Sequence, residues 1–123
     1  MILVVERDET MRHALAFYLE SLGFIVHTAL NGLEAVQIFS RDPKGFRVVF
    51  LDLDHSPGEL VRLFTDFRVM NADIKFIAVY GFAIPPETLR KLPSEAIGFI
   101  AKPFEPNDIL FVLRRLLGGD PIL

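Results

Sequence analysis

The chain alternates between short apolar runs and segments in which apolar residues recur every three or four positions. The run Ile2–Val5 is uninterrupted and ends at the charged Glu6, which predicts a strand buried on both faces. The segment after it has its apolar positions on one face of a helix, at Met11, Leu15, Tyr18 and Leu22. Gly23 is placed to end that helix.

The same alternation continues to the end of the chain. Further strands are expected at residues 24–28, 48–51, 74–79 and 97–101. Helices are predicted after Asp8 or Thr10, over residues 33–40, and from Gly58, Pro86 and Pro106. Asn31-Gly32 predicts a turn, and Pro93 stops the short helix that Pro86 begins. Five β-α units of this kind indicate an α/β fold with a parallel sheet and helices on both faces.

Composition narrows the class without naming a function. The 123 residues predict one domain, at residues 1–117, followed by a short C-terminal tail at 118–123. With no cysteine, disulfides, thiolate metal sites and a cysteine nucleophile are excluded. A net charge of −3 does not indicate a broad positively charged surface for nucleic acid. No apolar run is long enough for a signal peptide or a membrane span. We therefore expect a cytoplasmic protein that binds neither nucleic acid nor membranes.

Charged residues follow three of the expected strands. In open parallel sheets, ligands bind beyond the carboxyl ends of the strands, so these positions are the first candidates for a site. The residues there are Glu6, Arg7 and Asp8, then Asp52 and Asp54, then Tyr80 and Gly81, then Lys102 and Pro103. A cluster of acids with one lysine is typical of a site for a divalent cation and a phosphate.

Four segments, in this order and spacing, carry a resemblance to a known family. They are Ile2-Leu3-Val4-Val5-Glu6-Arg7-Asp8-Glu9 with Arg12 and Leu15, Gly23-Phe24 with Asn31-Gly32-Leu33-Glu34-Ala35, Val48-Val49-Phe50-Leu51-Asp52, and Gly98-Phe99-Ile100-Ala101-Lys102-Pro103-Phe104. Together they resemble the receiver domain of two-component response regulators. The resemblance implies a flavodoxin-like, doubly wound five-stranded sheet of order 2-1-3-4-5. It also implies a phosphorelay role without enzymatic turnover and a sensor histidine kinase as partner.

The family's functional residues transfer to positions of this chain one by one. By this resemblance Asp52 is the phosphoacceptor, and Lys102 contacts the phosphoryl oxygens and precedes a cis proline. Phe99 matches the switch aromatic. Glu6 matches the first of two acids after the first strand, so Glu6 and Asp52 are the expected ligands for Mg²⁺. Asp8 and Asp54 complete the expected acidic pocket.

Arg7 departs from the family pattern, because it stands where the second acid, a direct metal ligand, is expected. The change removes an oxygen ligand and introduces a guanidinium that cannot lose its proton. A unit positive charge about 5 Å from Mg²⁺ repels it by roughly 6–7 kcal/mol at an effective dielectric of about 20. We therefore expect metal-dependent phosphorylation of Asp52 to be weakened or lost. We also hypothesise that Arg7 lies in the acidic pocket and pairs with Asp52 or Glu6.

Two further departures concern the surroundings of Asp52. Tyr80 stands where the family has a threonine or serine that bonds the phosphoryl group, and its hydroxyl lies at the end of a rigid ring. The loop after Asp52, with Asp54, His55 and Pro57, lacks the family's Met-Pro step and its downstream Asp-Gly.

Other interpretations stay open at this stage. Asp52-Leu53-Asp54 after an apolar strand also resembles the first motif of haloacid-dehalogenase phosphohydrolases, in which the first acid is the nucleophile. A phosphorylation-independent interaction module is another alternative, with homodimerisation through the helix 4–strand 5–helix 5 face. Taken singly, Asp52 is explained as a turn cap, Lys102 as a solvated lysine and Phe99 as a core residue.

Overall fold

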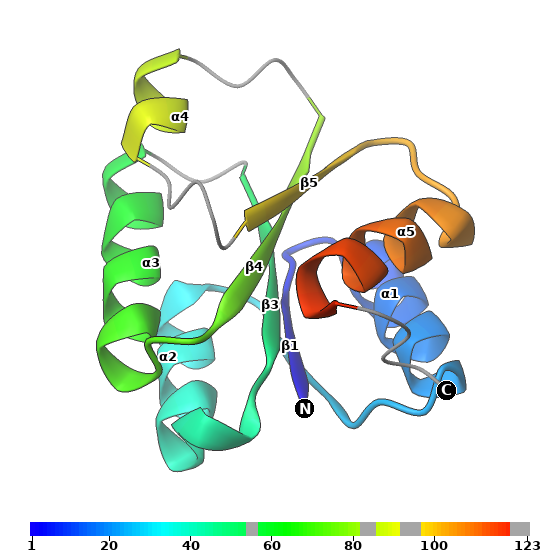
Figure 1. The fold of residues 1–123 in the computed structure, drawn as a ribbon, viewed down its shortest axis with the longest axis horizontal. Helices are drawn as coiled ribbons and strands as arrows, with labels where there is room; N and C mark the ends of the chain where they lie inside the picture. The colour runs from blue at the N-terminus through cyan, green and yellow to red at the C-terminus, as the bar shows by residue number, and fades with distance from the viewer. Residues whose placement is uncertain (54–56, 82–85, 92–96, 119–123) are drawn as a thin grey trace.

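Five parallel strands form one sheet in the order β2-β1-β3-β4-β5 (Figure 1). The computed structural model describes residues 1–53, 57–81, 86–91 and 97–118. The strands are β1 (Ile2–Val5), β2 (Val26–Ala29), β3 (Val48–Asp52), β4 (Lys75–Tyr80) and β5 (Ile97–Ala101). The predicted doubly wound sheet and its strand order are confirmed.

Helices cover both faces of the sheet. The helices are α1 (Glu9–Ser21), α2 (Gly32–Arg41), α3 (Pro57–Met70), α4 (Pro86–Lys91) and α5 (Pro106–Leu117), with a 3-10 turn η1 at Pro43–Gly45. Helices α2 and α3 lie on one side of the sheet, and α1 and α5 lie on the other (Figure 1). Each side therefore has its own apolar core. None of the helices within the described ranges is long and apolar enough to cross a membrane.

The core between the sheet and α2 and α3 is rich in phenylalanine. Phe39 is fully buried and packs against Phe46 at 5.2 Å and Phe67 at 4.8 Å between ring centroids. Phe76 on β4 meets Phe64 edge-on at 4.5 Å. Edge-to-face and offset contacts at these distances are favourable for aromatic rings. This cluster ties α2, α3 and η1 to the sheet.

The register of the strands brings the candidate residues to one edge. Val5 pairs with Leu51, so Glu6 follows β1 at the level where Asp52 ends β3. Tyr80 pairs with Ala101, which places Lys102 just beyond the last pair of β4 and β5. The carboxyl edge of the sheet therefore carries Glu6, Asp52, Tyr80 and Lys102.

Two local predictions differ from the structure. Strand β2 begins at Val26 rather than at residue 24, because the amide of Phe24 still bonds to Leu19 O of α1, at 3.3 Å. The turn expected at Asn31-Gly32 is instead the start of α2: Asn31 is its N-cap and accepts a hydrogen bond from the Glu34 amide at 2.9 Å. In both places the hydrogen bonds at a helix end determine the local structure, and the strand or turn pattern of the sequence does not.

Candidate functional site at the carboxyl edge of the sheet

Two buried acids and one lysine meet at this edge. Lys102 Nζ lies 3.2 Å from Asp52 Oδ2 and 3.9 Å from Glu6 Oε1. Glu6 is 2% and Asp52 6% exposed, whereas the Lys102 side chain is 22% exposed. Burying carboxylates is costly unless a cation and hydrogen bonds compensate them. Among the described residues, Lys102 is the cation that compensates both buried acids, and the Lys102–Pro103 bond is cis, as the resemblance implies.

Hydrogen bonds hold the loop that carries Glu6. The Glu6 amide donates to Ala29 O at 3.0 Å, and the Asp8 amide donates to Glu6 Oε1 at 3.3 Å. Arg12 donates through Nη1 to the carbonyls of Glu6 and Arg7 at 3.0 and 3.3 Å. In the sequence Arg12 serves only to set the motif register. In the structure it fixes the backbone that positions Glu6.

The surroundings of Glu6 favour its protonated form. Burial raises the pKa of Glu6 from its ordinary value of 4.5 to about 7, and a hydrogen bond to Asp52 and the Asp52 charge act in the same direction. Lys102 and the Asp8 amide act the opposite way but do not offset the rise. Near neutral pH Glu6 is therefore protonated for part of the time.

This raised pKa predicts a pH-dependent stability. The folded protein binds the Glu6 proton more tightly than the unfolded chain does, so the stabilisation is full below about pH 4.5 and is lost as the pH rises through about 7. We expect urea unfolding to show a falling free energy between these limits and Glu6→Gln to flatten the fall. Glu20→Gln on the exposed side of α1 is the matched control. An unchanged slope in Glu6→Gln would contradict the assignment.

Asp8 does not join the acidic cluster, contrary to the prediction. Its carboxylate caps α1, where Oδ1 accepts a hydrogen bond from the Met11 amide at 2.8 Å, and the residue is exposed. An N-cap acid satisfies an amide that would otherwise have no partner, which explains why it turns to the helix. Asp54 and His55 lie outside the described residues.

Arg7 does not pair with the buried acids, so that hypothesis is wrong for this structure. Arg7 is exposed, and within the described ranges the ion-pair partner of Glu6 and Asp52 is Lys102. The reason lies in the strand geometry: Glu6 turns inward after β1, and the next residue along the chain turns outward. Arg7 therefore lies at the surface, next to a pocket that it does not enter.

Tyr80 and Phe99 lie side by side on β4 and β5. Their rings meet edge-on at 6.4 Å, Tyr80 is half-buried and Phe99 is 38% exposed. Phe99 is thus not a core residue. Across the described part of the chain, the Tyr80 hydroxyl makes no hydrogen bond to Asp52 or Lys102, although the Tyr80 carbonyl accepts from the Lys102 amide at 2.8 Å. The ring of Tyr80 packs against Phe99, and its hydroxyl does not contact Asp52 or Lys102 as a short serine side chain could.

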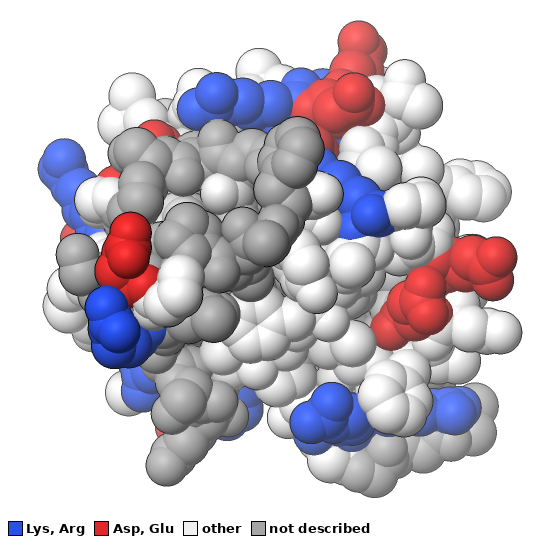
Figure 2. Space-filling view, turned by 90° about the horizontal axis from the view of Figure 1, so that it is seen from above, with Lys and Arg blue, Asp and Glu red and all other residues white. Residues whose placement is uncertain are grey.

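The described residues at this edge do not by themselves form a site for Mg²⁺. The described residues contain no group of three or more histidine, aspartate or glutamate side chains that could hold a metal ion. Of the expected pocket acids that the structure describes, Glu6 and Asp52 lie in the pocket, and both face Lys102 Nζ. Mg²⁺ needs near-octahedral oxygen ligands and loses its water reluctantly. The coloured part of this face shows basic and acidic side chains interspersed among uncharged ones (Figure 2).

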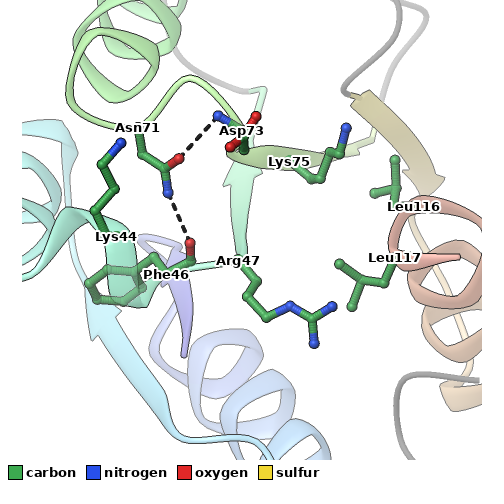
Figure 3. A pocket seen from close by; sticks show the side chains of 8 residues that line it. All are labelled: Lys44, Phe46, Arg47, Asn71, Asp73, Lys75, Leu116 and Leu117. Carbon is green, nitrogen blue, oxygen red and sulfur yellow. Dashed lines mark hydrogen bonds between the residues drawn. The ribbon is translucent and has the colours of Figure 1, made fainter.

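A separate hollow of about 330 Å³ lies at the opposite, amino edge of the sheet (Figure 3). Lys44, Arg47 and Lys75 contribute positive charge to its wall. The amide group of Asn71, also in the wall, is engaged by the backbone: Nδ2 donates to Pro43 O and Phe46 O at 2.9 and 3.1 Å, and Oδ1 accepts from the Asp73 amide at 3.0 Å. Asn71 therefore joins η1 to the end of α3.

Replacing Asn71 with alanine is expected to cost about 2 kcal/mol of stability, because it leaves backbone groups without partners. The Phe46 carbonyl is the most affected, since its bond to Asn71 is buried. Urea unfolding measures the loss, with Asn107→Ala on the exposed start of α5 as the control. Equal effects of the two substitutions would contradict this role.

Comparison with known proteins places the chain among signalling proteins. The sensor kinase CckA of Brucella abortus (strain 2308) is 31% identical over 117 residues, covering 94% of this chain and 12% of that protein. The probable transcriptional regulator ycf29 of Porphyra purpurea is 25% identical over 123 residues, covering 98% of this chain and 58% of the regulator. The chain thus spans only part of the length of these relatives.

Solved structures show the same fold. The chemotaxis protein CheY4 of Vibrio cholerae superposes with a TM-score of 0.79 at 22% identity, over 94% of this chain and 96% of that one. The receiver domain from the hybrid histidine kinase CckA gives a TM-score of 0.76 at 20% identity, over 94% and 97%. Both confirm the flavodoxin-like arrangement.

The family model of the response regulator receiver domain matches residues 2–114. This range contains all five strands and the cluster of Glu6, Asp52 and Lys102. It favours the receiver resemblance over the haloacid-dehalogenase one. The chain belongs to the response regulator receiver domain family, the receiver modules of two-component signalling.

Proposed function

We propose that this receiver domain accepts a phosphoryl group on Asp52. The observation that carries the proposal is the contact at 3.2 Å between Lys102 Nζ and Asp52 Oδ2 at the carboxyl end of β3. The Asp52 carboxylate is the nucleophile in this proposal, and the Lys102 ammonium group beside it can bind phosphoryl oxygens. Glu6 Oε1 lies 3.9 Å from Lys102 Nζ and adds a second acid to the pocket.

The partner proposed is a sensor histidine kinase, which would supply the phosphoryl group. Receiver domains interact with such kinases and generally bind Mg²⁺ at the phosphorylation site. The pocket has fewer candidate phosphoryl and metal contacts than the family pattern. Arg7 replaces an acid, the Asp8 carboxylate caps α1, and Tyr80 replaces a threonine or serine. Phosphorylation that depends on Mg²⁺ is therefore proposed to be weakened or lost in this chain.

Intact mass after incubation with acetyl phosphate tests the proposal. We expect slow incorporation of one phosphoryl group into the wild type and none into Asp52→Asn. Asp73→Asn, which changes an exposed acid at the amino edge, is the matched control and should be modified like the wild type. Equal incorporation into Asp52→Asn would show that another residue is the acceptor.

A second candidate function is association through the face formed by β5 and α5. Phe111 is 63% exposed, and the Arg115 guanidinium lies 5.8 Å from the centre of its ring. A hollow of about 360 Å³ beside them includes Phe99 and Pro103. Aromatic and arginine side chains are enriched where proteins meet. We propose this face for phosphorylation-independent homodimerisation.

Sedimentation without any phosphodonor tests this second candidate. A dimer that Phe111→Asp converts to a monomer is the expected result. Phe17→Asp, at a phenylalanine on α1 that is even more exposed than Phe111, is the control and should leave the dimer intact. A wild type that is monomeric at all accessible concentrations would contradict the proposal.

A further inference from the structure

The hollow of about 330 Å³ at the amino edge of the sheet is basic, although the chain as a whole is acidic. Lys44, Arg47 and Lys75 lie in its wall, and Asp73 is the only acid among the described residues that line it. The wall therefore has a surplus of positive charge, whereas the chain has a net charge of −3. Within the described ranges none of the three cations makes an ion pair. Their charge is therefore available to a bound anion.

Backbone hydrogen bonds fix the segments that carry these cations. The Lys75 amide, at the start of β4, donates to Arg47 O, just before β3, at 3.2 Å. Lys44 lies in η1, and the Pro43 carbonyl of that turn accepts from Asn71 Nδ2 at 2.9 Å. All three side chains thus extend from a backbone that is already ordered. An anion that binds there does not have to order these segments first.

The side of the hollow formed by α5 is apolar. Leu116 and Leu117 line it, and both side chains are half-buried. Figure 3 shows the Arg47 and Lys75 side chains extending toward these two leucines. A concave wall that combines apolar side chains with a few charged groups is typical of small-molecule sites, which occupy roughly 300–1,000 Å³. The hollow therefore fits a ligand of this size with an anionic part and an apolar part.

We infer that this hollow binds a small organic molecule that carries two or more phosphate groups beside an apolar part, such as a nucleoside diphosphate. The Arg47 guanidinium can donate two parallel hydrogen bonds to phosphate oxygens, and the lysines of the wall add further donors. A planar base can pack against Leu116 and Leu117, whereas an inorganic anion cannot. The inference does not depend on Asp52 as the phosphoacceptor.

The experiment titrates the full chain with ADP, AMP and pyrophosphate in about 150 mM salt and follows the backbone amides by NMR. Salt at this concentration screens loose attraction to surface charge. We expect saturable shifts of the Arg47, Lys75 and Leu117 amides, and ADP should bind at least about threefold more tightly than AMP or pyrophosphate. Arg47→Gln should weaken ADP binding by about tenfold. Arg90→Gln, at an exposed arginine of α4, should bind ADP like the wild type.

Two further variants separate the contributions of the two sides of the hollow. Lys75→Gln should weaken ADP and pyrophosphate alike, because it removes a donor to phosphate. Leu117→Ala should weaken ADP but leave pyrophosphate binding unchanged, because only the base contacts the leucine. A thermal melt of each variant confirms that it is folded before it is titrated.

Four results would overturn the inference. The first is the absence of saturable shifts at these amides with all three probes. The second is an equal loss of ADP binding in Arg90→Gln and Arg47→Gln, which would show unspecific attraction. Citrate that binds as tightly as ADP would contradict the preference for phosphate. Binding confined to vesicles of phosphatidylglycerol would assign this surface to a membrane instead.

Discussion

Replacing Lys102 with methionine is expected to destabilise the folded protein by about 2–4 kcal/mol near pH 8, because it removes a cation that lies against two buried acids. Glu6 and Asp52 are nearly fully buried, and both lie within 4.0 Å of Lys102 Nζ. The loss should shrink near pH 6, since the pKa of Glu6 is raised to about 7 and a proton then neutralises one acid. Urea unfolding at the two pH values measures both effects.

Two variants sharpen this test. Lys102→Met combined with Asp52→Asn should recover more than half of the lost stability, because one of the two uncompensated charges is removed. Lys44→Met, at an exposed lysine of η1, should change stability by less than about 0.5 kcal/mol. A loss in Lys102→Met that neither pH nor Asp52→Asn reduces would show that Lys102 acts through packing instead.

Replacing Phe39 with alanine is expected to cost about 3–5 kcal/mol of stability. Phe39 is fully buried between Phe46 and Phe67, so its removal leaves a cavity that α2 cannot close without losing the contacts of both rings. For a domain of this size the melting temperature should fall by roughly 10–20 °C. Calorimetry measures the change directly.

Phe17→Ala is the matched control for this core prediction. Phe17 is 77% exposed on α1, so removing its ring should alter stability by less than about 0.5 kcal/mol. A similar loss in the two variants would mean that burial of Phe39 is not what stabilises the fold.

The sequence predicts the fold well because its strands are buried on both faces. Runs such as Ile2–Val5 have no polar position, and their order and spacing leave few ways to form a parallel sheet. Strand β2 is the least well predicted. It lies at the edge of the sheet, and its start is set by hydrogen bonds at the end of α1, including that of the Phe24 amide. The pattern of apolar residues does not predict such backbone hydrogen bonds.

The candidate site is predicted in part. Glu6, Asp52 and Lys102 meet as expected, since parallel strands end at one edge. The sequence offers Asp8 two roles, as a cap of the first helix and as an acid of the pocket, and the structure confirms the first. It does not decide whether the Arg7 side chain enters the pocket. Asp8 has a helix to cap, and Arg7 turns to the surface. Charge type alone does not distinguish these outcomes.

The most direct test of the central claim is to locate the phosphoryl group itself. Reduction of an acyl phosphate with borohydride converts the modified aspartate to homoserine, which peptide mass spectrometry places in the sequence. We predict homoserine at position 52. Homoserine at another aspartate, or a phosphoryl group that survives on a different side chain, would contradict the assignment of Asp52.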